Sequence, residues 1–101
     1  MEYYKELYVG ESLRKKKDEI LKKLATGENM LSIYVITLAN GKHNQLEFCK
    51  SLLWEKGRLV VGIANGYAEA LEVIEVITRD VYDATGGAAI YKYICAKQRE
   101  E

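Results

Sequence analysis

Proline is absent from this chain of 101 residues, so no predicted helix or strand ends at a proline ring or at its missing N–H group. The turns and helix ends must instead come from the eight glycines and a few Asn residues. Gly10, Gly27, Gly57, Gly66 and Gly86 follow five stretches with regular apolar patterns. We therefore treat these glycines as the boundaries of the predicted elements.

Cysteine and histidine are scarce. Cys49 and Cys95 lie far apart and form no Cys-x-x-Cys pair, so neither a disulfide framework nor a zinc site is predicted, and two reduced, partly buried thiols are expected. The single histidine, His43, has no nucleophile or carboxylate pair near it in a recognised motif. We therefore expect no catalytic residue, no metal and no cofactor, and a protein that is not an enzyme.

Neither sign of charge is in excess, because 15 basic and 15 acidic residues give a formal net charge of zero. No global field then attracts nucleic acid or anionic lipid. The longest uncharged stretch, residues 29–41, is shorter than the roughly 18–20 apolar residues of a membrane-spanning helix. The first residues show no secretory signal pattern. We expect a soluble, cytoplasmic protein without membrane association.

The hydrophobic content of 49% and the charged content of 30% are typical of a folded globular protein. A chain of this length forms one core. We therefore expect a single domain over residues 1–101, in which residues 97–101 form a frayed tail.

The first half of the chain predicts a strand, a helix and a second strand. Residues 6–9 suggest a short edge strand that stops at Gly10. Ser12 is a candidate N-cap for a helix that reaches about Ala25, with Gly27 beyond its end. Residues 30–39 are almost continuously apolar, as expected of a strand covered on both faces at the centre of a sheet.

The second half begins with Asn40-Gly41, a strong tight-turn signal. After it, residues 43–48 fit either an antiparallel strand or a helix, and residues 51–56 predict a helix. Residues 59–64 predict a strand beside the first apolar strand, and residues 67–85 predict a long helix that ends at Gly86. Residues 88–96 fit either an edge strand or a short helix.

These elements predict an α/β or α+β fold, with a small mixed sheet of three to four strands and two long helices packed on it. The order and direction of the strands stay open.

A ligand-binding site is one functional hypothesis. Residues 61–67 run from a strand through a glycine turn into a helix, the layout of many anion sites, but they lack the third glycine of a dinucleotide motif and the Gly-Lys-Ser/Thr of a phosphate loop. The polar residues after the Asn40-Gly41 turn are the other half of this hypothesis. Its candidate residues are His43, Asn44, Asn65, Gly66 and Tyr67.

A nucleic-acid accessory role is a second hypothesis. Residues 14–23 carry six basic and two acidic side chains, the one basic surface that the sequence predicts. The candidate phosphate-binding residues are Lys15, Lys16, Lys17, Lys22 and Lys23. A solvated helix face explains the same pattern, and no interleaved aromatic residues support base recognition.

Self-association is the leading hypothesis. The helix over residues 67–85 has more apolar circumference than one packed face requires, and five acidic residues against one basic residue complement the charge of the basic helix. Eight tyrosines, most of them near the chain ends, suit an interface or the edges of a small core. We predict a non-enzymatic interaction module, a homodimer, with candidate interface residues Val73, Val76, Tyr82, Tyr91 and Tyr93.

Overall fold

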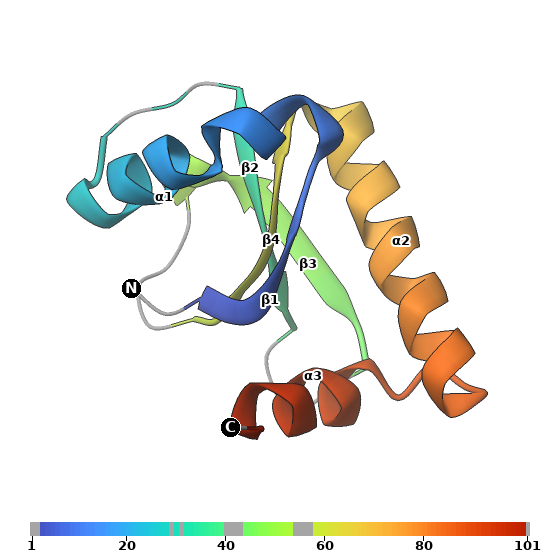
Figure 1. Ribbon diagram of the computed structural model, residues 1–101. Helices are drawn as coiled ribbons and strands as arrows, with labels where there is room; N and C mark the ends of the chain where they lie inside the picture. Colours follow the sequence, from blue (N-terminus) through green and yellow to red (C-terminus); the bar gives the residue numbers. More distant parts are fainter. Residues whose placement is uncertain (1–2, 29, 31, 40–43, 54–57, 101) are drawn as a thin grey trace.

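The computed structural model describes residues 3–28, 30, 32–39, 44–53 and 58–100. Four strands and three α-helices form one compact unit, shown in Figure 1. The elements in chain order are β1 (Tyr3–Val9), the 3₁₀ helix η1 (Glu11–Lys16), α1 (Lys17–Thr26), β2 (Ile33–Leu38), β3 (Leu46–Lys50), the 3₁₀ helix η3 (Ser51–Leu53), β4 (Val60–Asn65), α2 (Tyr67–Thr85) and α3 (Ile90–Arg99).

The four strands form one mixed sheet in the order β1-β4-β2-β3. Strand β1 runs parallel to β4, whereas β2 is antiparallel to both β4 and β3. The predicted α/β class, the mixed sheet and the packed helices are therefore confirmed. The strand order, which the sequence left open, puts β1 and β3 at the two edges.

The two central strands are β2 and β4, as their continuous apolar runs predicted. Val35, Ile36, Val60 and Ile63 have no exposed surface, because helices cover both faces of the sheet. Strand β3 pairs with β2 from Leu38–Leu46 to Tyr34–Lys50, which decides in favour of a strand for residues 46–50. The predicted turn at Asn40-Gly41 lies outside the described residues, as does the second half of the helix predicted over 51–56, of which Ser51–Leu53 is a 3₁₀ helix.

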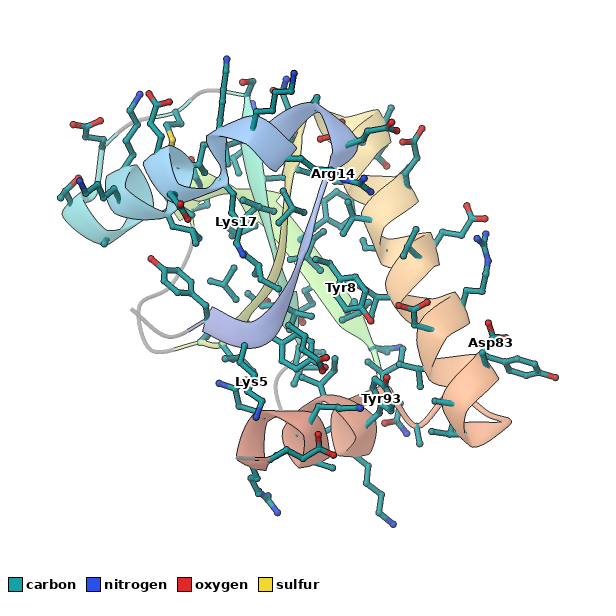
Figure 2. All side chains as sticks on the ribbon, viewed as in Figure 1. Lys5, Tyr8, Arg14, Lys17, Asp83 and Tyr93 are labelled. Carbon is teal, nitrogen blue, oxygen red and sulfur yellow. The ribbon has the colours of Figure 1, made fainter. Side chains whose placement is uncertain are left out.

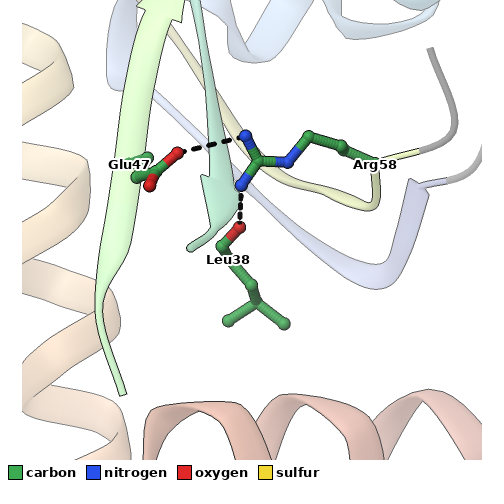
Figure 3. A network of polar contacts seen from close by, with 3 residues as sticks. All are labelled: Leu38, Glu47 and Arg58. Carbon is green, nitrogen blue, oxygen red and sulfur yellow. Dashed lines mark hydrogen bonds and ion pairs between the residues drawn. The ribbon is translucent and has the colours of Figure 1, made fainter. Parts of the chain in front are cut away.

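Arg58, which lies just before β4, contacts both β2 and β3. Its Nη2 donates to the carbonyl oxygen of Leu38 at 2.6 Å, and its Nη1 lies 3.1 Å from Glu47 Oε2 (Figure 3). Because Leu38 belongs to β2 and Glu47 to β3, one guanidinium group links the ends of three strands.

The sheet separates two hydrophobic clusters. On one face, α2 and α3 pack against buried residues that include Tyr4, Ile36 and Val61. On the other face, η1 and α1 pack with Leu13, Ile20 and Leu24 against another set of strand residues. Helices α1 and α2 therefore lie on opposite faces, as Figure 1 shows.

The first helical segment differs in part from the prediction. The chain enters the 3₁₀ helix η1 directly after Gly10, and α1 begins only at Lys17. The predicted N-cap at Ser12 was wrong, because the Ser12 hydroxyl donates to Glu69 Oε1 of α2 at 2.9 Å instead. Spacing along the chain does not reveal a partner 57 residues away.

Helix α2 has the predicted bounds. Gly66 precedes it at φ +87°, and Gly86 follows it at φ +74°. Only glycine adopts such angles without strain, so these two residues fix where the helix begins and ends.

For residues 88–96, which fit either an edge strand or a short helix, the structure has a helix, α3. It continues to Arg99, so the first three residues of the tail expected over 97–101 are helical. The side chain of Gln98 explains this: its Oε1 accepts from the Lys5 N–H at 2.8 Å, and its Nε2 donates to the Tyr3 carbonyl at 3.0 Å. The end of α3 is thereby attached to the outer edge of β1.

Candidate functional site

Helix α2 presents two flanks of different chemistry, one on each side of its buried line. The buried line consists of Ala70, Val73, Ile77 and Val81. One flank, which we call the aromatic flank, consists of Tyr67, Leu71 and Tyr82. The other, which we call the acidic flank, consists of Glu69, Glu72, Val76 and Asp80.

The aromatic flank faces β3. Its residues share one side of the helix because Leu71 lies about one turn after Tyr67, and Tyr82 about three turns after Leu71. The Tyr67 ring lies 5.5 Å from Phe48 of β3 and 6.5 Å from Tyr34 of β2, in edge-on arrangements. Tyr67, Leu71 and Tyr82 are nevertheless 59%, 44% and 62% exposed. The flank thus extends the aromatic cluster of the sheet into solvent.

The acidic flank faces β1 across a groove of about 350 Å³. Residues of three elements line the groove: Leu7, Tyr8 and Val9 of β1, Glu11 and Arg14 of η1, and Glu69, Glu72, Val73 and Val76 of α2. Figure 2 shows Arg14 and Tyr8 between β1 and α2. The volume lies near the lower end of the range for ligand sites, and the lining combines apolar and charged side chains.

Glu69 lies at the end of this groove that is nearest to η1. Its Oε1 accepts from the Asn65 N–H and from the Ser12 hydroxyl, each at 2.9 Å, and its Oε2 accepts from the Ser12 N–H at 3.3 Å. Gly10 lies so close that a Cβ atom there would overlap the Glu69 carboxylate. Glu69 therefore joins the β4–α2 turn to the start of η1 and fixes one wall of the groove.

Tyr8 and Asp80 are joined by a hydrogen bond at the other end of the acidic flank. The Tyr8 hydroxyl donates to Asp80 Oδ2 at 2.9 Å, and its ring stacks on Tyr4 at 6.2 Å. Burial, followed by the hydrogen bond to Asp80, raises the pKa of Tyr8 well above its ordinary value. Tyr8 is therefore neutral at physiological pH and acts as a hydrogen-bond donor.

The predicted interface residues fall in three different environments. Tyr82 is exposed on the aromatic flank, and Val76 is 42% exposed but borders the groove. Val73 is buried in the core, because its side chain packs over Gly62 of β4. Tyr93 packs against the core beneath β1 (Figure 2), and the half-buried Tyr91 donates its N–H to Asn44 Oδ1 at 3.1 Å. The structure thus does not bring the five residues together.

Leu71, Glu69 and Gln98 were not among the predicted site residues. A helical projection of residues 67–85 places Leu71 beside Tyr82, so the sequence held a signal for it. Glu69 stands at the third position of α2, where acidic side chains often bind free N–H groups. No signal in the sequence indicates that Gln98 binds β1.

The predicted ligand residues do not converge either. Asn65 pairs with Ile33 at one end of β2, whereas Asn44 lies beyond the Leu38–Leu46 pair at the other end. A shared pocket of Asn44, Asn65, Gly66 and Tyr67 is therefore wrong, because the length of β2 separates them. His43 lies outside the described residues.

The basic residues lie on the face opposite α2. Lys15 and Lys16 end η1, and Lys17, Lys22 and Lys23 belong to α1. Asp18 and Glu19 stand between the two groups of lysines, and Lys23 Nζ lies 3.3 Å from Glu19 Oε1. Because the sheet separates α1 from the acidic flank, these two charged surfaces do not neutralise one another within the subunit.

In the part of the chain that the structure describes, no helix has both the length and the apolar character needed to cross a membrane. The same residues contain no cluster of three or more His, Cys, Asp or Glu side chains suited to a metal ion. No protein-family model, curated protein or solved structure matches the chain. A function must therefore be inferred from the two flanks of α2 themselves.

Proposed function

We propose that this protein is a non-enzymatic assembly module that forms a homodimer through the aromatic flank. The observation that carries the proposal is the exposure of Tyr67, Leu71 and Tyr82 along one side of α2, where they adjoin the half-buried Tyr34 and Phe48. Tyrosine and phenylalanine are enriched in protein interfaces, because their rings bury a large area at a low cost in conformational entropy.

The size of the surface supports the proposal. A tyrosine contributes roughly 150–250 Å² on full burial, so the three exposed side chains and the adjoining rings offer an apolar patch of about 300–500 Å². Patches of about this size on monomers often serve in binding. With a polar rim, such a patch supplies the centre of an interface of about 800 Å² per subunit.

Charge favours a second copy on this flank. The ion pair between Arg79 and Glu75, with atoms 2.7 Å apart, runs along its outer border and leaves that border neutral. Two α2 helices packed antiparallel about a two-fold axis bring Tyr67 against the partner subunit's Tyr82. The same packing through the acidic flank brings carboxylates of both copies together, which is unfavourable.

A matched pair of substitutions tests the proposal. Leu71 and Val76 are 44% and 42% exposed on the same helix, about 140° apart around its axis. Leu71→Glu puts two charges into the proposed dimer, one per subunit, and is expected to raise its dissociation constant at least about tenfold. Val76→Glu adds the same charge outside the interface.

Sedimentation velocity over a concentration series measures the effect. The expected result is a wild-type dimer, a monomeric Leu71→Glu variant and a dimeric Val76→Glu variant, all with native circular dichroism. A wild-type protein that stays monomeric at high concentration contradicts the proposal. Equal effects of both substitutions do so as well.

A further inference from the structure

The outer edge of β1 is only partly covered. Tyr8 pairs with Gly62, and the Gly10 N–H donates to the Ile63 carbonyl of β4 at 2.8 Å, so the backbone groups of residues 8 and 10 face into the sheet. Peptide groups alternate along a strand. The N–H and C=O groups of Val9 and the C=O group of Leu7 therefore face outward, as the Lys5 N–H and the Tyr3 C=O do.

Gln98 covers one half of this edge. Its carboxamide accepts from Lys5 and donates to Tyr3, which are the two hydrogen bonds that a neighbouring strand makes. Beside Leu7 and Val9, by contrast, the groove of about 350 Å³ opens, and for these residues the described chain shows no such substitute. An uncovered strand edge is a template for another strand, and natural proteins usually protect it.

We propose that the groove between β1 and the acidic flank binds an extended segment of another polypeptide, which pairs with Leu7 and Val9 as an added strand and places basic side chains against α2. Strand addition of this kind derives its affinity from main-chain hydrogen bonds and its specificity from alternate side chains. The site is independent of the aromatic flank on the opposite side of the same helix.

The walls of the groove define the chemistry of the segment. Three carboxylates line the groove, Glu11, Glu69 and Glu72, against one basic side chain, Arg14, so the lining is acidic on balance. Beneath η1, the side chains of Leu7 and Val9 pack with the apolar cluster of the opposite face. Because side chains of a strand alternate between faces, the fitting sequence alternates basic and apolar residues.

Charge also argues against a second copy as the occupant. Pairing β1 with β1 of another subunit brings two acidic flanks to the same place, and like charges there oppose association at low ionic strength. A basic segment of a different protein has no such penalty. Its binding is expected to weaken as salt is added.

Defined peptides test the proposal on the intact protein. The probe is a capped peptide of about eight residues in which Lys and Val alternate, long enough for one strand. One control replaces each Lys with Glu, and another keeps the Lys–Val sequence but carries N-methyl groups on alternate amides. We expect the Lys–Val peptide to slow hydrogen exchange at the Val9 amide, and both controls to bind at least about tenfold more weakly.

Two substitutions at one position test the protein side. Val9→Pro removes an outward N–H that the β1–β4 pairing does not use, whereas Val9→Ala shortens the side chain and keeps the N–H. Val9→Ala is expected to retain the affinity within a few-fold, and Val9→Pro to lose at least about tenfold. Glu72→Lys, on the exposed wall, should reverse the preference towards the Glu–Val peptide.

Several results overturn the proposal. These are no binding of the Lys–Val peptide, equal binding of its N-methylated form, or chemical-shift changes at Tyr67 and Leu71 instead of Leu7 and Val9. A dimer abolished by Val9→Pro but not by Leu71→Glu shows that the groove holds a second copy, and this also overturns it. Should Val9→Pro not fold, the N-methylated peptide and Glu72→Lys decide the question.

Discussion

Removal of the Glu69 carboxylate is expected to destabilise the protein more than removal of any other acidic side chain on α2. The change Glu69→Ala deletes three hydrogen bonds, two to Ser12 and one to the Asn65 N–H. Hydrogen bonds to charged groups contribute roughly 1.5–3 kcal/mol each when buried. Because Glu69 is only half-buried, solvent replaces part of this, and we expect a total loss of about 2–3 kcal/mol.

This loss is large against a typical stability of about 5–15 kcal/mol, and it corresponds to a fall in Tm of about 10–20 °C for a domain of this size. Urea unfolding followed by circular dichroism measures it. Glu72→Ala is the control, since Glu72 is exposed one turn further along α2, and its expected effect is below about 0.5 kcal/mol.

Ser12→Ala extends the test, because it removes only the hydroxyl bond to Glu69. In a double-mutant cycle, Ser12→Ala should cost about 1 kcal/mol in the wild type and almost nothing after Glu69→Ala. If the two substitutions are additive, or if Glu69→Ala and Glu72→Ala cost the same, Glu69 does not join η1 to α2.

Three further predictions concern single features of the fold. Gly66→Ala should lower the free energy of unfolding by about 1–3 kcal/mol, because φ is +87° at this position. Gly87→Ala adds a Cβ in open space and should be nearly neutral. Thermal unfolding compares the two variants. Arg58→Lys should lower the free energy of unfolding by about 1 kcal/mol, because an ammonium group cannot reach both Glu47 and the Leu38 carbonyl as the guanidinium does. Glu47→Gln keeps a neutral acceptor and should lower it less. Urea titration measures both variants. Burial raises the pKa values of Tyr3, Tyr4 and Tyr8 above their ordinary value of 10.0. Above about pH 10 the unfolded chain therefore loses protons that the folded state keeps, so the contribution of these tyrosines to stability should be constant below about pH 9 and fall at higher pH. A free energy of unfolding that stays level to about pH 11 contradicts this, and Tyr4→Phe should make the fall less steep.

The fold followed from the sequence wherever one pattern dominated. The apolar runs around Val35 and Ile63 predicted two adjacent buried strands, and Gly66 and Gly86 predicted both ends of α2. The sequence alone did not decide between a strand and a helix for 43–48 and 88–96, since short apolar runs fit both periods. The decision came from pairing, with Phe48 opposite Ile36 in the sheet and Ile94 buried beneath α2 and β1.

The site was less accessible to sequence reasoning, because it depends on contacts between distant segments. The sequence indicated that α2 has more apolar surface than one packed face needs. It did not indicate how that surface is distributed: Val73 is buried in the core, Val76 borders the groove and Tyr82 lies on the aromatic flank. The groove itself arises where β1 meets a helix that begins 58 residues after the strand ends. No local pattern encodes such a meeting.

Dilution of isotope-labelled protein, followed by two-dimensional NMR, tests the two roles of α2 most directly. We predict that signals of Tyr67, Leu71 and Tyr82 shift between micromolar and roughly millimolar protein, while the amides of Leu7 and Val9 keep their positions until a basic extended peptide is added. Signals that do not depend on concentration anywhere, or that change only along the acidic flank, contradict the account.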